Sequence, residues 1–225
     1  NNVETLYWVP DILNRGAEWF ASQGKNGAKG LRSYSVSGRV REPGVKLAPA
    51  GTTARELVND YCGGMLDGHR FKGYLPGGAS GGILPERMAD LPLEFGKLEE
   101  HGCFVGSHAV VILSDRDDMG DVALNLMKFF EDESCGQCTP CRNGTEKAVR
   151  LMSERRWDAA ALNDLAQVMR DASICGLGQA APNPLVAVLK YFPEDVAKRS
   201  EPGGLTPDGA PADEPPPGGE ERTNL

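Results

Sequence analysis

The sequence predicts an α+β protein, in which a β-grasp-like unit is followed by a small four-helix bundle and a disordered tail. Three observations predict this order. Short segments rich in β-branched and aromatic residues occupy residues 33–115. Apolar residues recur with helical spacing from about residue 120 onward. Residues 201–225 contain six Pro, five Gly and almost no large apolar side chain, so they cannot bury enough surface to offset the entropy of ordering.

The first residues are predicted to form a helix and a loop that precede the sheet. A short helix is expected around residues 9–20. The following residues, 22–30, are rich in Gly and Lys, which is typical of an exposed loop or linker. Residues 1–32 therefore form a first segment of their own.

The β-grasp-like unit is expected to begin with two strands and a helix. Tyr34, Val36 and Val40 alternate with polar neighbours, as in a half-buried strand. The turn signal Glu42-Pro43-Gly44 precedes a return strand that begins at Val45. A helix capped by Thr53 should follow, and its apolar face and its end are marked by Ala54, Leu57, Val58, Tyr61 and Gly63.

Two further strands are predicted to complete this unit, which ends near residue 115. One covers Phe71 to Leu75, and the other covers the continuously apolar run from Ala109 to Leu113, as expected of a strand buried on both faces. The glycine-rich run from Gly73 to Gly82 lacks the Gly-Lys-Ser/Thr ending of a phosphate-binding P-loop. A flexible loop is predicted there instead.

Residues 116–199 are predicted to form a bundle of four amphipathic helices. Asp158 and Asn183 can cap the third and fourth helices, and Pro184 falls in the first turn of the fourth, where proline is tolerated. The inward faces are expected to be formed by Ala123, Leu126, Met127 and Phe130, by Ala148, Leu151 and Met152, by Leu162, Leu165, Ala166 and Met169, and by Leu185, Val188, Leu189 and Phe192. Residues 200–225 form the predicted acidic tail.

Composition and charge exclude several classes of function. The net charge is −8, and residues 201–225 contribute −5 of it, so the remaining body is nearly neutral and predicts no nucleic-acid partner. No apolar run approaches the ~18 residues of a membrane span, so no direct membrane insertion is expected. No signal peptide is visible, which predicts a cytoplasmic protein. The first residue is Asn rather than Met, so we expect the sequence to be a fragment or a processed piece of a longer chain.

Four of the six cysteines form the strongest chemical signal in the sequence. Cys135, Cys138 and Cys141 share two C-x₂-C steps, and such close thiolates can hold three irons of a cubane cluster. Cys175 is the natural candidate for the fourth ligand, because it lies in a glycine-bearing turn between two predicted helices. The spacing therefore predicts a [4Fe–4S] cluster on these four residues.

Two alternatives for these cysteines remain open at this stage. A structural zinc site is one of them, although Zn–Cys₄ sites usually draw two C-x₂-C pairs from separate knuckles. A disulfide framework is less consistent with a chain that has no secretion signal. Cys62 and Cys103 are each predicted to be small buried hydrophobic residues. No Ser/His/Asp arrangement or paired-carboxylate motif supports hydrolytic chemistry, so no catalytic residue is assigned.

The motifs together resemble a known family of flavoproteins. The opening run Asn1 to Leu6, the strand pair from Ser37 to Gly44, the cysteine loop from Glu133 to Arg142 and the turn from Ser173 to Gly178 resemble the NADH-binding flavoprotein subunit of complex I and its relatives. Among these relatives, the chain looks most like the β subunit of soluble NAD-dependent formate dehydrogenases. The segments that favour this branch are 61–65, 77–82 and 178–184.

The resemblance, which covers about residues 1–197, implies further features of the site. Residues 33–115 would be a soluble-ligand-binding β-grasp (SLBB) domain, and residues 116–199 would hold the cluster. Asn1 and Asn2 match an Asn pair that lies against FMN in the family, so both are candidate cofactor-binding residues. The family's glycine-rich FMN and NADH site lies upstream of that pair. FMN and NAD are therefore expected as cofactors of a domain outside this sequence, and residues 1–32 would be the remnant of that domain and a linker.

The resemblance also implies partners and leaves several functions open. The leading hypothesis is an electron-transfer part of an NAD-dependent formate dehydrogenase, acting with a molybdopterin-containing large subunit and a small [2Fe–2S] subunit. A flavoprotein subunit of complex I or of an NAD-linked hydrogenase is the second hypothesis. A zinc-stapled binding module is the third, and it comes from a different class of protein.

Overall fold

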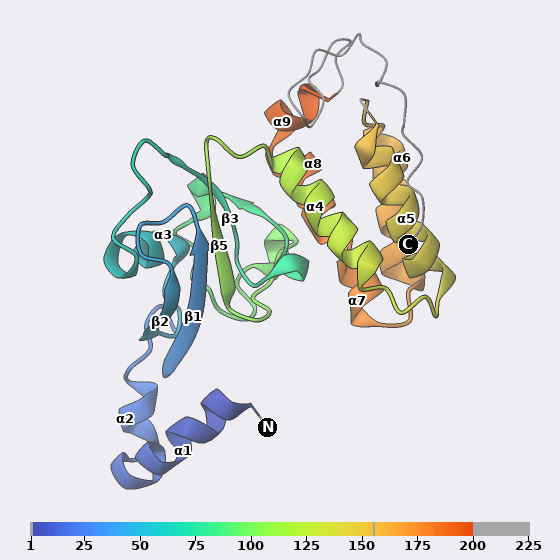
Figure 1. The fold of residues 1–225 in the computed structure, drawn as a ribbon. Coiled ribbons are helices and arrows are strands. Elements are labelled where there is room, and N and C mark those ends of the chain that lie inside the picture. The colour runs from blue at the N-terminus through green and yellow to red at the C-terminus, as the bar shows by residue number, and fades with distance from the viewer. Residues whose placement is uncertain (1, 155, 200–225) are drawn as a thin grey trace, which may run out of the picture.

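The computed structural model describes residues 2–154 and 156–199 of the chain (Figure 1). Its sheet lies on one side of the molecule, helices α4 to α8 lie on the other, and α1 and α2 lie beyond the β1 and β2 end of the sheet (Figure 1). The predicted α+β class is confirmed. The predicted tail at 200–225 and the candidate residue Asn1 lie outside the described residues.

A five-stranded mixed sheet forms the first half of the fold. Its strands are β1 (Leu31–Gly38), β2 (Gly44–Pro49), β3 (Phe71–Leu75), β4 (Leu84–Pro85) and β5 (Ala109–Ser114), in the order β2-β1-β5-β3-β4. The central strand β5 runs parallel to β1 and antiparallel to β3. The hairpin β1–β2, the helix after it and the return of the chain to β5 are the predicted β-grasp-like arrangement. Strand β4 was not predicted, because two residues are too short to show a period.

The helix predicted after Thr53 is present, but its hydrogen bonding changes part-way along. Thr53 and Glu56 form a capping box, in which each residue's side chain accepts from the other's backbone N–H, at 3.2 and 2.9 Å. The first residues form α3 (Ala54–Glu56), and the chain then widens into a π-helical turn, η1 (Leu57–Tyr61). The predicted end is confirmed, since Gly63 has a φ of +67°.

The helix predicted at residues 9–20 is wrong in its bounds. Helix α1 (Val3–Arg15) begins earlier, because the Asn2 side chain accepts a hydrogen bond of 3.1 Å from the Thr5 N–H and caps it. The chain turns at Gly16, whose φ is +91°, and continues as α2 (Ala17–Ala21). The predicted single helix is therefore two helices that meet at a glycine.

The glycine-rich run at 73–82 is more buried than a flexible loop would be. Pro76, Gly77 and Gly81 are all buried, and a short 3₁₀ turn, η2 (Ala79–Gly81), lies within it. A Cβ on Gly77 would lie 2.1 Å from the Gly106 nitrogen, so glycine is required for this close approach of two backbones. Two further 3₁₀ turns, η3 (Glu86–Met88) and η4 (Glu99–His101), follow before β5.

The second half of the fold contains the four predicted helices and two short additional ones. The predicted helices are α4 (Met119–Asp132), α5 (Thr139–Ser153), α6 (Ala159–Ala172) and α8 (Asn183–Tyr191), and the additional ones are α7 (Gly176–Ala180) and α9 (Pro193–Ala197). Asp158 caps α6 as predicted. The capping role predicted for Asn183 is wrong, since its side chain instead donates a 3.0 Å hydrogen bond to the Ser80 carbonyl.

The sheet and the helices share a hydrophobic core and a buried ion pair. One hydrophobic cluster includes Tyr34 and Ile112 of the sheet together with Met127 and Val188 of the helices. The fully buried Asp195 accepts hydrogen bonds from Lys72 of β3 at 2.5 Å, from Lys198 at 2.6 Å and from the Met119 N–H at 3.0 Å. The division into domains at 1–32, 33–115, 116–199 and 200–225 remains a prediction.

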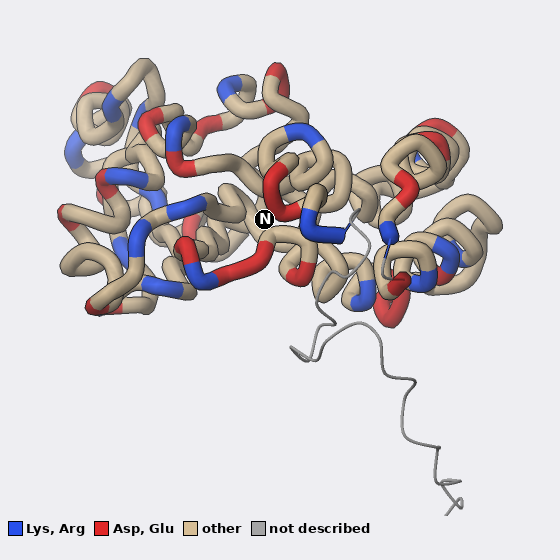
Figure 2. Tube along the Cα trace, turned by 90° about the horizontal axis from the view of Figure 1, so that it is seen from above, with Lys and Arg blue, Asp and Glu red and all other residues tan. Residues whose placement is uncertain are grey.

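The charges of the described chain are of mixed sign. Figure 2 shows Lys and Arg interspersed with Asp and Glu along the trace. Within the described residues, none of the helices is long and apolar enough to cross a membrane.

Candidate iron–sulfur site

The four predicted cysteine ligands surround one cavity at an end of the helical bundle. Cys135 and Cys138 lie in the loop between α4 and α5, Cys141 lies in the first turn of α5, and Cys175 immediately precedes α7. The cavity has a volume of about 270 Å³. Its lining consists of Glu133, Ser134, Cys135, Gln137, Cys138, Cys141, Ile174, Cys175 and Leu177. The structure thus brings together all four residues that the sequence singled out, although Cys175 lies far from the others along the chain.

The cysteine loop is held in shape by backbone and side-chain hydrogen bonds. Gly136 has a φ of +72°, a conformation that favours glycine and lets the chain turn between the first two cysteines. Arg142 donates a 2.6 Å hydrogen bond to the Gly136 carbonyl, and Thr145 donates one of 2.9 Å to the Cys141 carbonyl. The Arg142 side chain therefore helps to fix the conformation of the loop.

The Cys138 thiol lies in a surrounding that favours its ionised form. The backbone N–H groups of Ile174 and Cys141 and the Ser173 hydroxyl lower the pKa of Cys138 below its ordinary value. Thiolates are the form in which cysteines bind metals. The groups around Cys138 therefore favour the thiolate, the form of the side chain that binds a metal.

A cluster and a single zinc ion require different spacings of four thiolates. Zn–S bonds of about 2.3 Å would bring four sulfurs to within roughly 3.8 Å of one another. A cubane cluster spreads its thiolates more widely, because each one binds a different iron. The cavity is also many times larger than the ~30 Å³ that a water molecule occupies in the liquid. The four thiols and the cavity between them fit a [4Fe–4S] cluster.

Exposure differs sharply among the four cysteines. Cys141 is buried and Cys138 is half-buried, whereas Cys135 and Cys175 are exposed. Ile174, beside Cys175, has 72% of its surface exposed. The cavity therefore has an inner side toward the bundle and an outer side that faces solvent.

The other two cysteines are buried, as predicted. Cys62 and Cys103 have 0% and 1% of their surface exposed, and both belong to the hydrophobic core of the sheet region. Burial raises the pKa of both thiols, that of Cys103 to about 12. All six cysteines are free thiols, so the disulfide alternative finds no support in the described chain.

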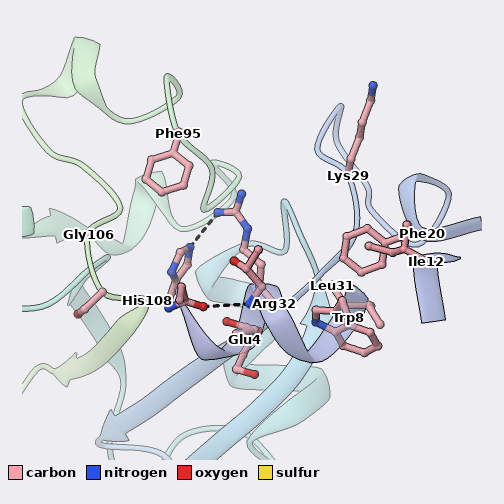
Figure 3. Close-up of a pocket in the computed structure, with 14 residues that line it drawn as sticks. Glu4, Trp8, Ile12, Phe20, Lys29, Leu31, Arg32, Phe95, Gly106 and His108 are labelled. Carbon is pink, nitrogen blue, oxygen red and sulfur yellow. Dashed lines mark hydrogen bonds between the residues drawn. The ribbon is translucent and has the colours of Figure 1, made fainter. Parts of the chain in front are cut away.

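A second, larger cavity of about 540 Å³ lies between α1, α2 and β1 (Figure 3). Asn2 is exposed at this cavity and caps α1, and its contact with FMN remains a prediction. Arg32 donates hydrogen bonds to Glu94 at 2.7 Å and contacts the His108 ring nitrogen at 2.8 Å. Burial and the neighbouring Arg32 lower the pKa of His108. Sequence reasoning missed this polar group, because Arg32 lies 62 positions from Glu94 and 76 positions from His108, and the three share no local motif.

Comparison with known proteins shows which family these features belong to. Residues 121–199 match the family model described as the NADH-ubiquinone oxidoreductase-F iron-sulfur binding region. Among the NADH-quinone oxidoreductase F subunits, that of Escherichia coli (strain K12) is 39% identical to the chain over 202 residues, which are 87% of this chain and 45% of that protein. This chain is a homologue of the F subunits over their C-terminal portion. The matched iron–sulfur region contains all four candidate cysteines.

Relatives of the F subunits from other enzyme complexes are similar as well. The chain is 34% identical to the NADP-reducing hydrogenase subunit HndC of Solidesulfovibrio fructosivorans over 198 residues, covering 85% of this chain and 40% of that protein. It superposes on the crystal structure of an NAD⁺-reducing [NiFe]-hydrogenase in the H2-reduced state with a TM-score of 0.78 at 30% identity, covering 90% of this chain and 35% of that one. The chain spans about half the length, or less, of the curated relatives it matches.

Proposed function

We propose that this chain binds one [4Fe–4S] cluster through Cys135, Cys138, Cys141 and Cys175 and relays electrons within an NAD-linked oxidoreductase. The observation that carries this proposal is the cavity enclosed by these four thiols, inside the region that matches an iron-sulfur binding family. A bound cluster supplies one-electron transfer, which thiol chemistry alone cannot.

Other residues around the cavity have distinct roles in this proposal. The N–H groups around Cys138 stabilise negative charge on the sulfur. Cys141 of α5 and Leu177 of α7 line the cavity from the helices. The exposed Cys135 and Cys175 mark the side on which an electron donor or acceptor can approach.

In the complete enzyme, a cluster held by the four cysteines would supply one-electron transfer to or from FMN, and the flavin would supply hydride exchange with NAD. A flavin is suited to this position because it couples one-electron to two-electron chemistry. Asn2 would lie against the FMN, together with Asn1. This part of the proposal is supported by the homology to NADH-quinone oxidoreductase F subunits, and it includes a cytoplasmic location for the enzyme.

Within this class, we propose that the partner enzyme is an NAD-dependent formate dehydrogenase. Formate would be oxidised at the molybdopterin of a large subunit, and a small [2Fe–2S] subunit would complete the relay. Support comes from the sequence segments 61–65, 77–82 and 178–184, which resemble the β subunits of such enzymes. A molybdopterin subunit encoded beside this chain is the expected finding, and a neighbouring quinone-reductase or hydrogenase operon would contradict the assignment.

A second candidate is favoured by the relatives themselves. They are NADH-quinone oxidoreductase F subunits and an NADP-reducing hydrogenase subunit. In either case the relay on the four cysteines would be the same, and only the partner would differ.

Metal analysis of the chain purified without oxygen tests the relay itself. The proposal predicts a brown protein with about four irons per chain, as one four-thiolate cluster requires. A colourless protein with one zinc per chain would instead identify a zinc-stapled binding module and reject the relay.

A further inference from the structure

The hydroxyl of Ser173 is a buried polar group without a hydrogen-bond partner. Ser173 has 4% of its surface exposed, and its Oγ is enclosed and forms no hydrogen bond of ordinary geometry with the described residues. Leaving a buried hydroxyl unpaired is unfavourable, because the group loses its hydrogen bonds to water without replacing them. The residue is held in place by its backbone, since its N–H donates to the Met169 carbonyl at 3.2 Å and its carbonyl accepts from Gln179 at 2.9 Å. These two backbone hydrogen bonds fix the position of Ser173, although its hydroxyl forms no hydrogen bond of ordinary geometry.

This hydroxyl lies close to the predicted cluster ligands. A Cβ added to Gly178 would lie 2.6 Å from the Ser173 Oγ and 2.8 Å from the Cys141 Cβ, so the three residues are in close contact. The same hydroxyl is near enough to the Cys138 thiol to help lower its pKa, although the two groups form no hydrogen bond of ordinary geometry. A thiol is a weak hydrogen-bond acceptor, whereas a metal-bound thiolate is a strong one.

A second serine occupies a similar position at the neighbouring ligand. The Ser134 Oγ lies 3.4 Å from the Cys141 Sγ. The same oxygen accepts a hydrogen bond of 3.3 Å from the Gly136 N–H. Because the oxygen accepts from the backbone, the hydroxyl proton is available for the sulfur. Two of the four predicted ligands therefore each have a serine hydroxyl beside the sulfur.

We propose that Ser173 and Ser134 are positioning residues that donate hydrogen bonds to the ligand thiolates of Cys138 and Cys141 and so raise the reduction potential of the cluster. The inference rests on the proposed function, because it requires a cluster on these cysteines. Reduction adds negative charge that is shared with the ligand sulfurs, and a donor stabilises that charge. Removing either donor should therefore make the cluster harder to reduce.

The test is a redox titration of the full chain followed by EPR. We expect Ser173→Ala and Ser134→Ala each to shift the one-electron equilibrium toward the oxidised cluster by about threefold to tenfold, or roughly 30–60 mV at 59 mV per tenfold. Ser173→Thr, which keeps a hydroxyl, should restore the potential. The matched control is Ser153→Ala at the end of α5, where the hydroxyl donates to the Val149 carbonyl at 2.7 Å. That variant should leave the potential unchanged.

The outcomes separate this inference from the proposed function. Unchanged potentials in both alanine variants, with full iron content, would overturn the inference and leave the relay intact. A shift as large in Ser153→Ala would also overturn it, since the effect would then be non-specific. If Ser173→Ala fails to retain iron, Ser134→Ala decides the question alone. A wild-type chain without iron would reject the proposed function itself.

Discussion

Cysteines of the sheet and cysteines of the helical bundle lie in opposite environments. Cys62 and Cys103 are packed into the apolar core of the sheet region, where burial raises the pKa of each thiol. Cys138 lies at a cavity where backbone N–H groups are directed at the sulfur, and its pKa is lowered. The same side chain is therefore a small hydrophobic residue in one region and a candidate metal ligand in the other. The difference lies in the donors and the space around each sulfur, not in the cysteine.

The largest expected effect is the loss of the cluster when one of its ligands is removed. We expect Cys141→Ala to abolish binding of the cluster, because three thiolates leave one iron without its protein ligand. Cys103→Ala is the matched control and should keep about four irons per chain, since this residue lies in the core of the sheet region. Iron analysis of both variants decides the matter. Full iron content in Cys141→Ala would show that Cys141 is not a required ligand.

The reactivity of the thiols gives the next largest effect. Because the pKa of Cys103 is raised to about 12, its thiolate at pH 7 should be roughly 10³-fold scarcer than that of an ordinary cysteine. In the iron-free chain, Cys138 should be alkylated far faster, and its rate should level off at a lower pH than that of a free cysteine. Mass spectrometry of the alkylated peptides measures both rates, with circular dichroism to check that the chain stays folded. Equal rates in a folded chain would contradict the prediction.

The ion pair of Asp195 with Lys72, which joins the two regions, is expected to give a smaller effect, on stability. Asp195 is buried and accepts from Lys72 and Lys198, so Asp195→Asn should lower the free energy of unfolding by about 3 kcal/mol. Burial opposes ionisation, but Lys198 and Lys72 outweigh it and the pKa of Asp195 is lowered. Its contribution is therefore complete above the unfolded-state pKa of about 3.9 and is lost as the pH falls through the lower folded-state value. Urea unfolding at several pH values measures this. A wild-type chain as stable at pH 2 as at pH 6 would contradict it.

The smallest expected effect is confined to the sheet region. Thr53→Ala removes the N-cap of α3 and should cost about 1 kcal/mol of stability. Because Thr53 lies in the sheet region and the cysteines lie in the bundle, iron content should not change. Denaturant unfolding together with iron analysis tests both statements. Loss of iron in this variant would show that the two regions are not separable in the way the comparison assumes.

Much of the cluster site was predictable from sequence because its chemistry is local. Three of the cysteines fall within seven residues, and a glycine-bearing turn identifies the fourth. The α+β class followed from periodicity, whereas α7, α9 and β4 are too short to show a period. The contact between Lys72 and Asp195 spans 123 positions and has no local signal. The close approach of Ser173 to Gly178 of α7 and to Cys141 also has no local signal.

EPR of the dithionite-reduced chain tests whether the four cysteines of the bundle hold one [4Fe–4S] cluster. The account predicts a half-integer-spin signal that integrates to about one spin per chain in the wild-type protein and is absent from Cys141→Ala. The same signal in both proteins, or none in an iron-loaded wild-type chain, would contradict the assignment of these residues.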